Sequence, residues 1–305
     1  MQAIVLSAYG DAHQLKLQER PEPEPGAGQI KVKVLSSSVN PVDWKLRSGA
    51  LKAAMPLELP VILGRDAAGE VVKVGAGVQD FRVGDRVFGL VHGSYAQFVV
   101  APVAAWAKIP EGLDTDAGAL PLVSLTGEQL AAAALTGISP SGATVLVTGA
   151  IGAVGRVAVW GIRQRGARVI AGVRGKQVDE AKKLGAAEVV ALDDDAALER
   201  LPPLDAIADT VGGETVQRLL PKLKAKGSIG SVVGEPKGAK DRGFTVHAFM
   251  AQPDRAGLEK VARAVARGEL SIPIAKRFAL EDIAQAHELA ERGGVGKILL
   301  LPFGS

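Results

Sequence analysis

The sequence predicts an α/β protein in which a doubly wound parallel sheet is joined to a second, β-rich domain. Short strand-like runs separated by turn signals fill the first third of the chain, whereas strands alternate with helical segments beyond Asp116. Within this second region, residues 144–176 contain a strand, a glycine turn, a helix and another strand in succession. The chain has 305 residues, a length that also favours two domains over one.

The first part of the chain is expected to form the β-rich domain. Turn-rich stretches at residues 21–28, 74–85 and 91–94 separate short runs that are rich in β-branched residues. Short strands separated in this way are typical of a compact β domain. The expected strands are residues 3–6, 29–36, 69–74, 85–89 and 96–100.

The central part is expected to form the parallel sheet. An Ala/Leu-rich helix is predicted from Asp116 to about Leu135, and short apolar strands then alternate with helices. The expected strands of this sheet are residues 144–148, 168–173, 188–192, 206–209, 228–233 and 244–249.

The alternation of strands and helices ends at Pro253, and the remaining residues are expected to return to the first domain. They predict a helix, a strand, a second helix and a last strand at residues 258–270, 271–280, 281–293 and 297–302. The expected β-rich domain therefore combines residues 1–118 and 255–305. Residues 119–254 form the expected sheet domain.

Three glycines follow the predicted strand at residues 144–148. They let the backbone bend sharply, let a pyrophosphate approach the main chain and let the next helix pack closely on the sheet. The N–H groups at the start of that helix would bind the phosphates. The turn departs from the G-x-G-x-x-G pattern because Ala150 stands where the first of those glycines would be. We expect a Rossmann-type dinucleotide site, with an ordinary crossover that binds no ligand as the alternative. The expected cofactor contacts in the turn are Gly149, Ala150, Ile151, Gly152, Ala153, Val154 and Gly155.

The end of the second strand favours NADP(H) over NAD(H). An NAD site usually has a carboxylate about 20 residues after the turn, where it accepts hydrogen bonds from the ribose. No acidic residue occurs in this place before Asp179, whereas Arg174 and Lys176 offer positive charge to a 2′-phosphate. The alternatives are that both cations lie in a solvated loop, or that Asp179 reaches the ribose.

Composition and charge exclude several classes of function. The formal net charge is only +3, and Lys and Arg occur without a block of like charges, so a nucleic-acid surface is not predicted. Because cysteine is absent, disulfides, thiolate metal sites and a cysteine nucleophile are excluded. The first residues lack the features of a secretory signal, and Pro140 with its neighbouring glycines interrupts the uncharged run at residues 129–155. We therefore expect a cytoplasmic protein without a membrane segment.

Distinctive strings, such as SVNPVDWKLRSG and LGRDAAGEVVKVG, occur in a particular order along the chain. They are residues 38–49, 63–75, 81–89, 93–100, 147–155, 182–190, 209–214 and 286–300. Together they resemble the zinc-independent branch of the medium-chain dehydrogenase/reductase superfamily, in its quinone oxidoreductase and enone reductase group. The resemblance covers nearly the whole chain. It implies a GroES-like substrate domain split around a central Rossmann domain, with the nicotinamide between them, and a homodimer formed through residues 244–249.

The resemblance also shows where zinc-dependent alcohol dehydrogenases of this superfamily would have their catalytic metal ligands. The first position holds Val39 and Asn40, and the usual Gly-His-Glu is replaced by Gly64, Arg65 and Asp66. No metal site is expected, because cysteine is absent and the histidines are scattered. Arg65 and Asp66 are expected to form an ion pair in the vacant place. The four histidines are His13, His92, His247 and His287.

Without zinc as a Lewis acid, quinones and α,β-unsaturated carbonyls are the substrates that fit. Hydride from the dinucleotide leaves charge on a substrate oxygen, which a few hydrogen-bond donors can stabilise. By the resemblance, Asn40 lies beside the nicotinamide and is expected to donate to that oxygen, while Asp43 braces the loop. Many relatives have a tyrosine where this chain has Lys45. Lys45 is therefore the second candidate catalytic residue, as proton donor, and a solvated lysine is the alternative.

Further cofactor contacts are suggested by the resemblance and by positions that follow strands of the sheet. They are Thr126, Val211, Gly212, Val233, Gly234 and Lys297. Each has the alternative of being only a turn or strand residue. The expected partner is a small electrophile, a quinone or an enone. Reduction of an enoyl thioester is one competing function, and non-catalytic NADPH binding, as in a sensor or a crystallin-like protein, is the other.

Overall fold

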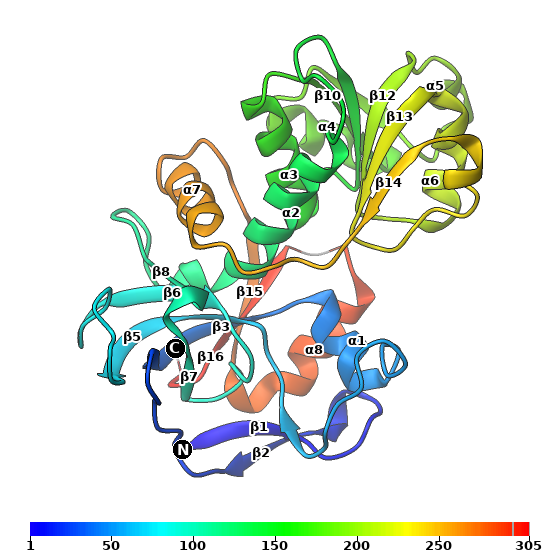
Figure 1. Cartoon of the computed structure of the whole chain (residues 1–305). Coiled ribbons are helices and arrows are strands. Elements are labelled where there is room, and N and C mark those ends of the chain that lie inside the picture. Colours follow the sequence, from blue (N-terminus) through cyan, green and yellow to red (C-terminus); the bar gives the residue numbers. More distant parts are fainter. Residues whose placement is uncertain (295, 305) are drawn as a thin grey trace. The chain divides into compact units, whose positions relative to one another are not determined.

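The chain divides into two units (Figure 1). The first unit combines the part of the sequence that precedes the second unit with the part that follows it. The structure is a computed structural model that describes residues 1–294 and 296–304. The first unit comprises Met1–Leu122 and Pro253–Ser305, and the second comprises Val123–Gln252. These limits differ by a few residues from the expected ones. The first boundary lies later because Leu122, although already helical, donates its amide to Asp66 of the first unit.

The second unit is built on a six-stranded sheet in which every pair of neighbouring strands is parallel. The order β11-β10-β9-β12-β13-β14 reverses direction between β9 and β12, which is the arrangement of a doubly wound sheet. This confirms the expected fold class. The strands are β9 (Thr144–Thr148), β10 (Arg168–Val173), β11 (Glu188–Ala191), β12 (Leu204–Asp209), β13 (Leu223–Ser231) and β14 (Thr245–Ala248).

Helices cover both faces of this sheet, and each face has its own apolar core (Figure 1). On β9, Val145 and Val147 belong to the core under α2, α3 and α4, whereas Leu146 belongs to the core under α5 and α6. Alternate side chains of a strand point to opposite faces, so a strand buried on both sides is apolar throughout. The helices are α2 (Pro121–Ala134), α3 (Ala153–Gln164), α4 (Val178–Ala181), α5 (Asp195–Glu199) and α6 (Gly213–Leu219).

The first unit contains a seven-stranded sheet and a separate three-stranded sheet, ordered β2-β1-β4. The long strand β3 is central to the larger sheet, because it pairs with β5, β7 and β16. Helices α1 (Pro41–Ser48), α7 (Arg255–Ala266) and α8 (Ile283–Arg292) complete the unit. The strands are β1 (Gln2–Leu6), β2 (Leu15–Glu19), β3 (Gln29–Val39), β4 (Val61–Ile62), β5 (Asp66–Val74), β6 (Arg86–Leu90), β7 (Phe98–Pro102), β8 (Trp106–Lys108), β15 (Ile274–Ala279) and β16 (Lys297–Leu301).

Several elements begin or end away from their expected limits because of proline. The helix expected from Asp116 is a short 3₁₀ turn followed by α2, which starts at Pro121. The strand expected from residue 271 starts only at Ile274, after Pro273. The 3₁₀ helices are η1 (Ala12–Gln14), η2 (Val103–Ala105), η3 (Thr115–Ala119), η4 (Gly175–Gln177), η5 (Lys182–Leu184), η6 (Leu220–Lys222), η7 (Lys240–Arg242) and η8 (Leu280–Asp282).

Helix α1 was not among the expected elements, although its sequence contains three helix signals. Asn40 is a favourable N-cap residue, Pro41 is favourable at the first helical position, and Gly49 ends the helix. The helix has only eight residues, which is too short for a clear apolar period. Within the described residues, no helix has both the length and the apolar character required to cross a membrane.

Candidate active site

Helix α1 places Asn40 at the end of a buried strand. Asn40 follows β3 directly and caps the helix with an extended backbone, at φ −118° and ψ 159°. Its backbone N–H donates to Asp43 Oδ2 at 2.8 Å, which links the cap to the first helical turn. Gly49 ends the helix at φ 82°, a left-handed conformation that glycine adopts without strain. Both ends of α1 are therefore defined by capping residues. The N-cap residue, Asn40, is only 1% exposed.

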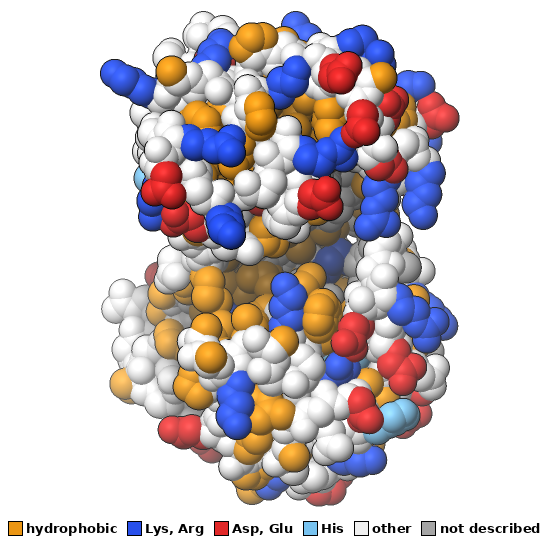
Figure 2. Space-filling model, turned by 90° about the vertical axis from the view of Figure 1, so that its right-hand side faces the viewer, with side chains coloured by type: hydrophobic (Ala, Val, Ile, Leu, Met, Phe, Trp, Pro, Cys, Tyr) orange, Lys and Arg blue, Asp and Glu red, His pale blue; other side chains and the backbone are white. Residues whose placement is uncertain are grey.

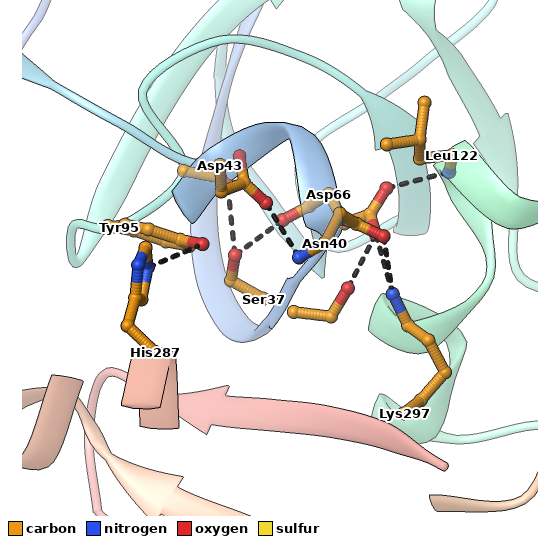
Figure 3. A network of polar contacts seen from close by, with 10 residues as sticks. Ser37, Asn40, Asp43, Asp66, Tyr95, Leu122, His287 and Lys297 are labelled. Atoms are coloured by element: carbon orange, nitrogen blue, oxygen red, sulfur yellow. Dashed lines mark hydrogen bonds and ion pairs between the residues drawn. The ribbon is translucent and has the colours of Figure 1, made fainter. Parts of the chain in front are cut away.

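Three side chains meet around the Asn40 amide group (Figure 3). Asn40 Nδ2 donates to Asp66 Oδ2 at 2.8 Å, and Lys297 Nζ donates to Asn40 Oδ1 at 2.7 Å. Lys297 Nζ also lies 3.4 Å from Asp66 Oδ2, which makes a buried ion pair. The register of the sheet brings them together, because β3 pairs Ser38 with Asp66 and Val39 with the residue that follows Lys297. We call Asn40, Asp66 and Lys297 the buried triad.

The Asp66 carboxylate is held from several directions. The amide of Leu122, at the start of α2, donates to Asp66 Oδ1 at 2.7 Å. Ser38 Oγ donates to Asp66 Oδ2 at 2.5 Å, beside the bonds from Asn40 and Lys297. A carboxylate at a helix N-terminus is stabilised by the helix dipole, and bonds to a charged acceptor are stronger than bonds between neutral groups. Asp66 is fully buried, and both of its oxygens accept hydrogen bonds.

The expected ion pair between Arg65 and Asp66 is wrong. Arg65 immediately precedes strand β5, and successive side chains of an extended chain point to opposite sides. Asp66 pairs with Lys297 instead, whereas Arg65 Nε is buried without a hydrogen-bond partner in the part of the chain that the structure describes. Arg65 lies near His92, and burial together with the Arg65 charge lowers the pKa of that histidine.

Burial shifts the pKa values of the charged groups in this region. It lowers the pKa of Lys297, and the carboxylates of Asp66 and Asp43 oppose that shift. Burial raises the pKa of Asp43 to about 7, against the hydrogen bond from the Asn40 backbone. Asp43 therefore takes up and releases its proton near neutral pH, in direct contact with the Asn40 backbone.

A second group of buried polar residues, Tyr95 and His287, lies near Asp43 (Figure 3). His287 Nε2 lies 3.3 Å from the Tyr95 hydroxyl, and the two rings pack edge to face. Burial and then the Asp43 charge raise the pKa of Tyr95. Burial, with a smaller effect of the Arg47 charge, lowers the pKa of His287 to about 3, so this imidazole is neutral at physiological pH.

Sequence reasoning did not select Asp66, Tyr95 or His287 as functional residues. Tyr95 and His287 are 192 residues apart, and no local motif indicates that they are in contact. Lys45, which the sequence did suggest, lies on α1 outside this network. It is half-buried, and its ammonium is 5.6 Å from the centre of the Trp44 ring. Its role as a proton donor stays a prediction.

In the second unit, the glycine turn joins β9 to α3. A side chain at Gly149 or Gly155 would clash with neighbouring atoms in this conformation. Gly149 has φ 63°, and a Cβ there would lie 2.5 Å from Thr210 Oγ1. A Cβ on Gly155 would lie 2.2 Å from the Gly149 carbonyl oxygen. Gly152 caps the helix and is exposed, and among the described residues no side chain accepts from the first helical amides. These amides and the open backbone fit the pyrophosphate of a dinucleotide. Of the other expected contacts in the turn, Ala150 is buried, and Ile151, Ala153 and Val154 are half-buried.

Asp209, at the end of β12, fixes the loop that follows this strand. Its Oδ1 accepts from Thr148 Oγ1 at 2.7 Å and from the amides of Val211 and Gly212 at 3.1 and 3.0 Å. Val211 is 49% exposed and Val233, after β13, is 43% exposed. These apolar side chains therefore face solvent near the carboxyl ends of the strands beside the switch point, where ligands of such sheets bind.

The other expected cofactor residues are in varied surroundings. Arg174 and Lys176 follow β10, are exposed, and make no ion pair within residues 1–294 and 296–304. Asp179, the acidic alternative, pairs with Lys182 at 2.7 Å. Exposed Gly234 has φ 106°, Thr126 is half-buried on α2, and Lys297 belongs to the buried triad. On the face drawn in Figure 2, Lys and Arg side chains are interspersed with Asp and Glu.

Comparison with known proteins connects both units to one family. Residues 26–111 match the model of the alcohol dehydrogenase GroES-like domain, and residues 184–300 match a model named zinc-binding dehydrogenase. The chain is 32% identical over 255 residues to a chloroplast envelope quinone oxidoreductase homolog of Arabidopsis thaliana, which covers 77% of this chain and 76% of that protein.

Solved structures give the same result. The quinone oxidoreductase from Coxiella burnetii has a TM-score of 0.89 and 31% identity, covering 99% of both chains. The mycobacterial protein Rv1454c, solved in complex with NADPH, has a TM-score of 0.83 and 27% identity, covering 99% of this chain and 100% of that chain. The chain belongs to the quinone oxidoreductase family of the medium-chain dehydrogenase/reductase superfamily. This confirms the resemblance found in the sequence, and the protein is an oxidoreductase of that family.

One of the matching family models is named for zinc. The side chains around Asp66 in this chain, however, do not fit a zinc ion. Asp66, which the resemblance matches to a metal-ligand position of the zinc-dependent enzymes, already accepts hydrogen bonds on both oxygens. The ammonium of Lys297 lies 3.4 Å from it and would repel a metal cation. Among the described residues, no group of three or more His, Cys, Asp or Glu side chains is arranged to hold a metal ion.

Proposed function

We propose that this oxidoreductase is a zinc-independent, NADPH-dependent reductase that transfers hydride to a quinone or an α,β-unsaturated carbonyl. The observation behind this proposal is the buried triad. It supplies a fixed amide donor and a buried positive charge next to each other. Two groups of this kind stabilise negative charge on an oxygen, which is the charge that hydride addition to such substrates produces.

Asn40 is the proposed catalytic residue of the first unit. Its Nδ2 has two protons, and one of them is engaged by Asp66. The proposal assigns the second proton to a substrate oxygen. Quinones and conjugated carbonyls spread the developing charge over several atoms, so that hydrogen-bond donors suffice and no Lewis acid is needed. Lys45 remains a candidate for delivering the proton to the product.

The proposed cofactor site lies at the carboxyl edge of the parallel sheet. NADPH would supply the hydride there. The glycine turn and the first amides of α3 would hold the pyrophosphate, and exposed Arg174 and Lys176 would attract the 2′-phosphate. Val211 and Val233 would offer apolar contacts. The complex of Rv1454c with NADPH supports this choice of cofactor.

The Arg174→Ala variant tests the choice between the two dinucleotides. The KM for NADPH should rise about 10- to 100-fold, because a charge-assisted hydrogen bond to phosphate is lost, while the KM for NADH should change little. Steady-state kinetics with both cofactors measure this difference. Arg200→Ala is a matched control, since Arg200 is also exposed and follows α5. Equal effects of Arg174→Ala on both cofactors would show that Arg174 does not bind the phosphate.

The substrate class is tested by following NADPH oxidation with a quinone, a short enone and an enoyl thioester. Turnover of the first two supports the proposal, whereas preference for the thioester would assign the enzyme to the competing class. Binding of NADPH in calorimetry without turnover of any electrophile would favour a sensor or crystallin-like role. Calorimetry without any saturable binding would refute the cofactor and the reaction together.

We also propose that the chain forms a homodimer through strand β14. This strand lies at the edge of the sheet and pairs only with β13 among the described residues, so its outer N–H and C=O groups are available to a second copy. Light scattering should give about twice the chain mass of 31.5 kDa. A mass equal to that of a single chain would contradict the proposal.

A further inference from the structure

We propose that Lys297 is a positioning residue that locks the Asn40 amide in the orientation in which Nδ2, rather than Oδ1, faces the substrate oxygen. This inference rests on the proposed function and extends it. Sequence comparison suggested that Lys297 contacts the cofactor. That contact stays a prediction, and the structure shows that the Lys297 side chain is 5% exposed and ends on Asn40 Oδ1 and Asp66 Oδ2.

The chemistry of the two neighbours permits only one orientation of the amide. A lysine ammonium only donates hydrogen bonds and an ionised carboxylate only accepts them. Asn40 Oδ1 must therefore face Lys297, and Asn40 Nδ2 must face Asp66, as the distances of 2.7 and 2.8 Å show. A rotation of the amide by 180° would oppose N–H to ammonium and oxygen to carboxylate. Both hydrogen bonds would be lost and replaced by repulsion.

The two neighbours cannot rotate with the amide, because other elements hold them. Asp66 accepts from the Leu122 amide and from Ser38 Oγ, and its own carbonyl oxygen accepts from Ser37 Oγ. Lys297 is the first residue of β16 and is buried. The orientation of Asn40 is therefore set by groups that come from three separate strands, β3, β5 and β16.

This role differs from simple structural support, and a paired substitution separates the two. Lys297→Met alone leaves the Asp66 carboxylate buried without its counter-charge, which destabilises the fold. The double variant Lys297→Met/Asp66→Asn removes both charges and preserves side-chain size. The amide introduced at position 66 can either donate or accept, so it no longer selects one orientation of Asn40. A purely structural role predicts that activity returns with the fold.

Asn40 is the only asparagine among the 305 residues, which gives a direct measurement of its orientation. In protein that contains asparagine labelled with ¹⁵N in the side chain, the NMR spectrum of the coenzyme-free chain has one amide pair to observe. The wild type should show a single pair with two well-separated proton shifts and slow exchange of the proton bound to Asp66.

The double variant contains a second labelled amide, at position 66. Its signals are separated from those of Asn40 by recording the same spectrum with Asn40→Ala added to the double variant, because only the Asn40 signals then disappear. For Asn40 in the double variant we expect two sets of signals or averaged shifts, since both orientations of the amide are now populated.

The kinetic measurement is made on the same proteins. We expect the double variant to keep its NADPH dissociation constant and its KM for the quinone, and to lose at least about tenfold in kcat, since the donor faces the oxygen for only part of the time.

A double variant that is folded, has one wild-type-like Asn40 amide pair and retains full kcat would overturn the inference. So would two sets of Asn40 amide signals in the wild type, a measurement that needs no variant. An inactive wild type would refute the proposed function, and the amide spectrum would still decide the orientation.

Discussion

Replacing Asn40 by alanine should lower kcat about 100- to 1000-fold, the usual loss when one fixed donor to a developing oxyanion is removed. The NADPH dissociation constant should stay nearly unchanged, because the glycine turn lies in the other unit. The substitution leaves Lys297 and Asp66 paired with each other, so that neither charge is isolated. Steady-state kinetics with a quinone and calorimetry with NADPH measure the two quantities.

Ser48→Ala is the matched control for this experiment. Ser48 lies on the same helix α1, and its hydroxyl donates to the Lys45 carbonyl and accepts from the Ala50 amide. Wild-type turnover is expected for this variant, together with an unchanged melting temperature within a few degrees. Wild-type kcat in folded Asn40→Ala would remove Asn40 from the mechanism and leave the triad as a structural feature.

The second large effect concerns stability against acid. Between pH 7 and pH 4, the unfolding free energy of the Asp43→Asn variant should fall by about 3 kcal/mol more than that of the wild type. Burial raises the pKa of Asp43 from 3.8 to about 7 in the folded chain, so in this window the folded state binds a proton that the unfolded state releases. Protonation of Asp43 therefore stabilises the wild type progressively as the pH falls, and the variant lacks this contribution.

His287 has the opposite effect. Burial lowers its pKa from 6.5 to about 3, so the unfolded chain binds a proton in that range while the folded chain does not. Stability is lost as the pH falls through this window, by about 5 kcal/mol in total. The slopes of Asp43 and His287 nearly cancel where their windows overlap. His287→Phe should accordingly be less sensitive to acid than the wild type, and Asp43→Asn more sensitive.

Urea unfolding at a series of pH values measures both slopes, with the first unit followed through Trp44 and Trp106. Exposed Glu111, replaced by glutamine, serves as the control for the loss of a single carboxylate from the surface. The prediction fails if Asp43→Asn and the wild type lose stability in parallel on acidification. Such a result would mean that the Asp43 carboxyl titrates as if it were in water.

The elements that the sequence predicted correctly are those with local signals. Residues 144–148 and the glycine turn are contiguous in the chain, and the apolar period of α3 follows at once, so the doubly wound sheet was recognisable. The buried triad was not. Lys297 and Asn40 are 257 residues apart, and only the pairing of β16 with β3 brings them together. The pairing of Arg65 with Asp66 was wrong because adjacency in sequence is a poor guide to contact in an extended segment.

The position of Lys297 on β16 has a consequence for the order of biosynthesis. Residues 123–252, the entire second unit, are translated before β16, whereas Asn40 and Asp66 are translated ahead of both. Domains generally fold as they leave the ribosome. The nascent protein can therefore complete its second unit while the Asp66 carboxylate still has no lysine partner, and the buried triad is assembled only in the final stage of synthesis.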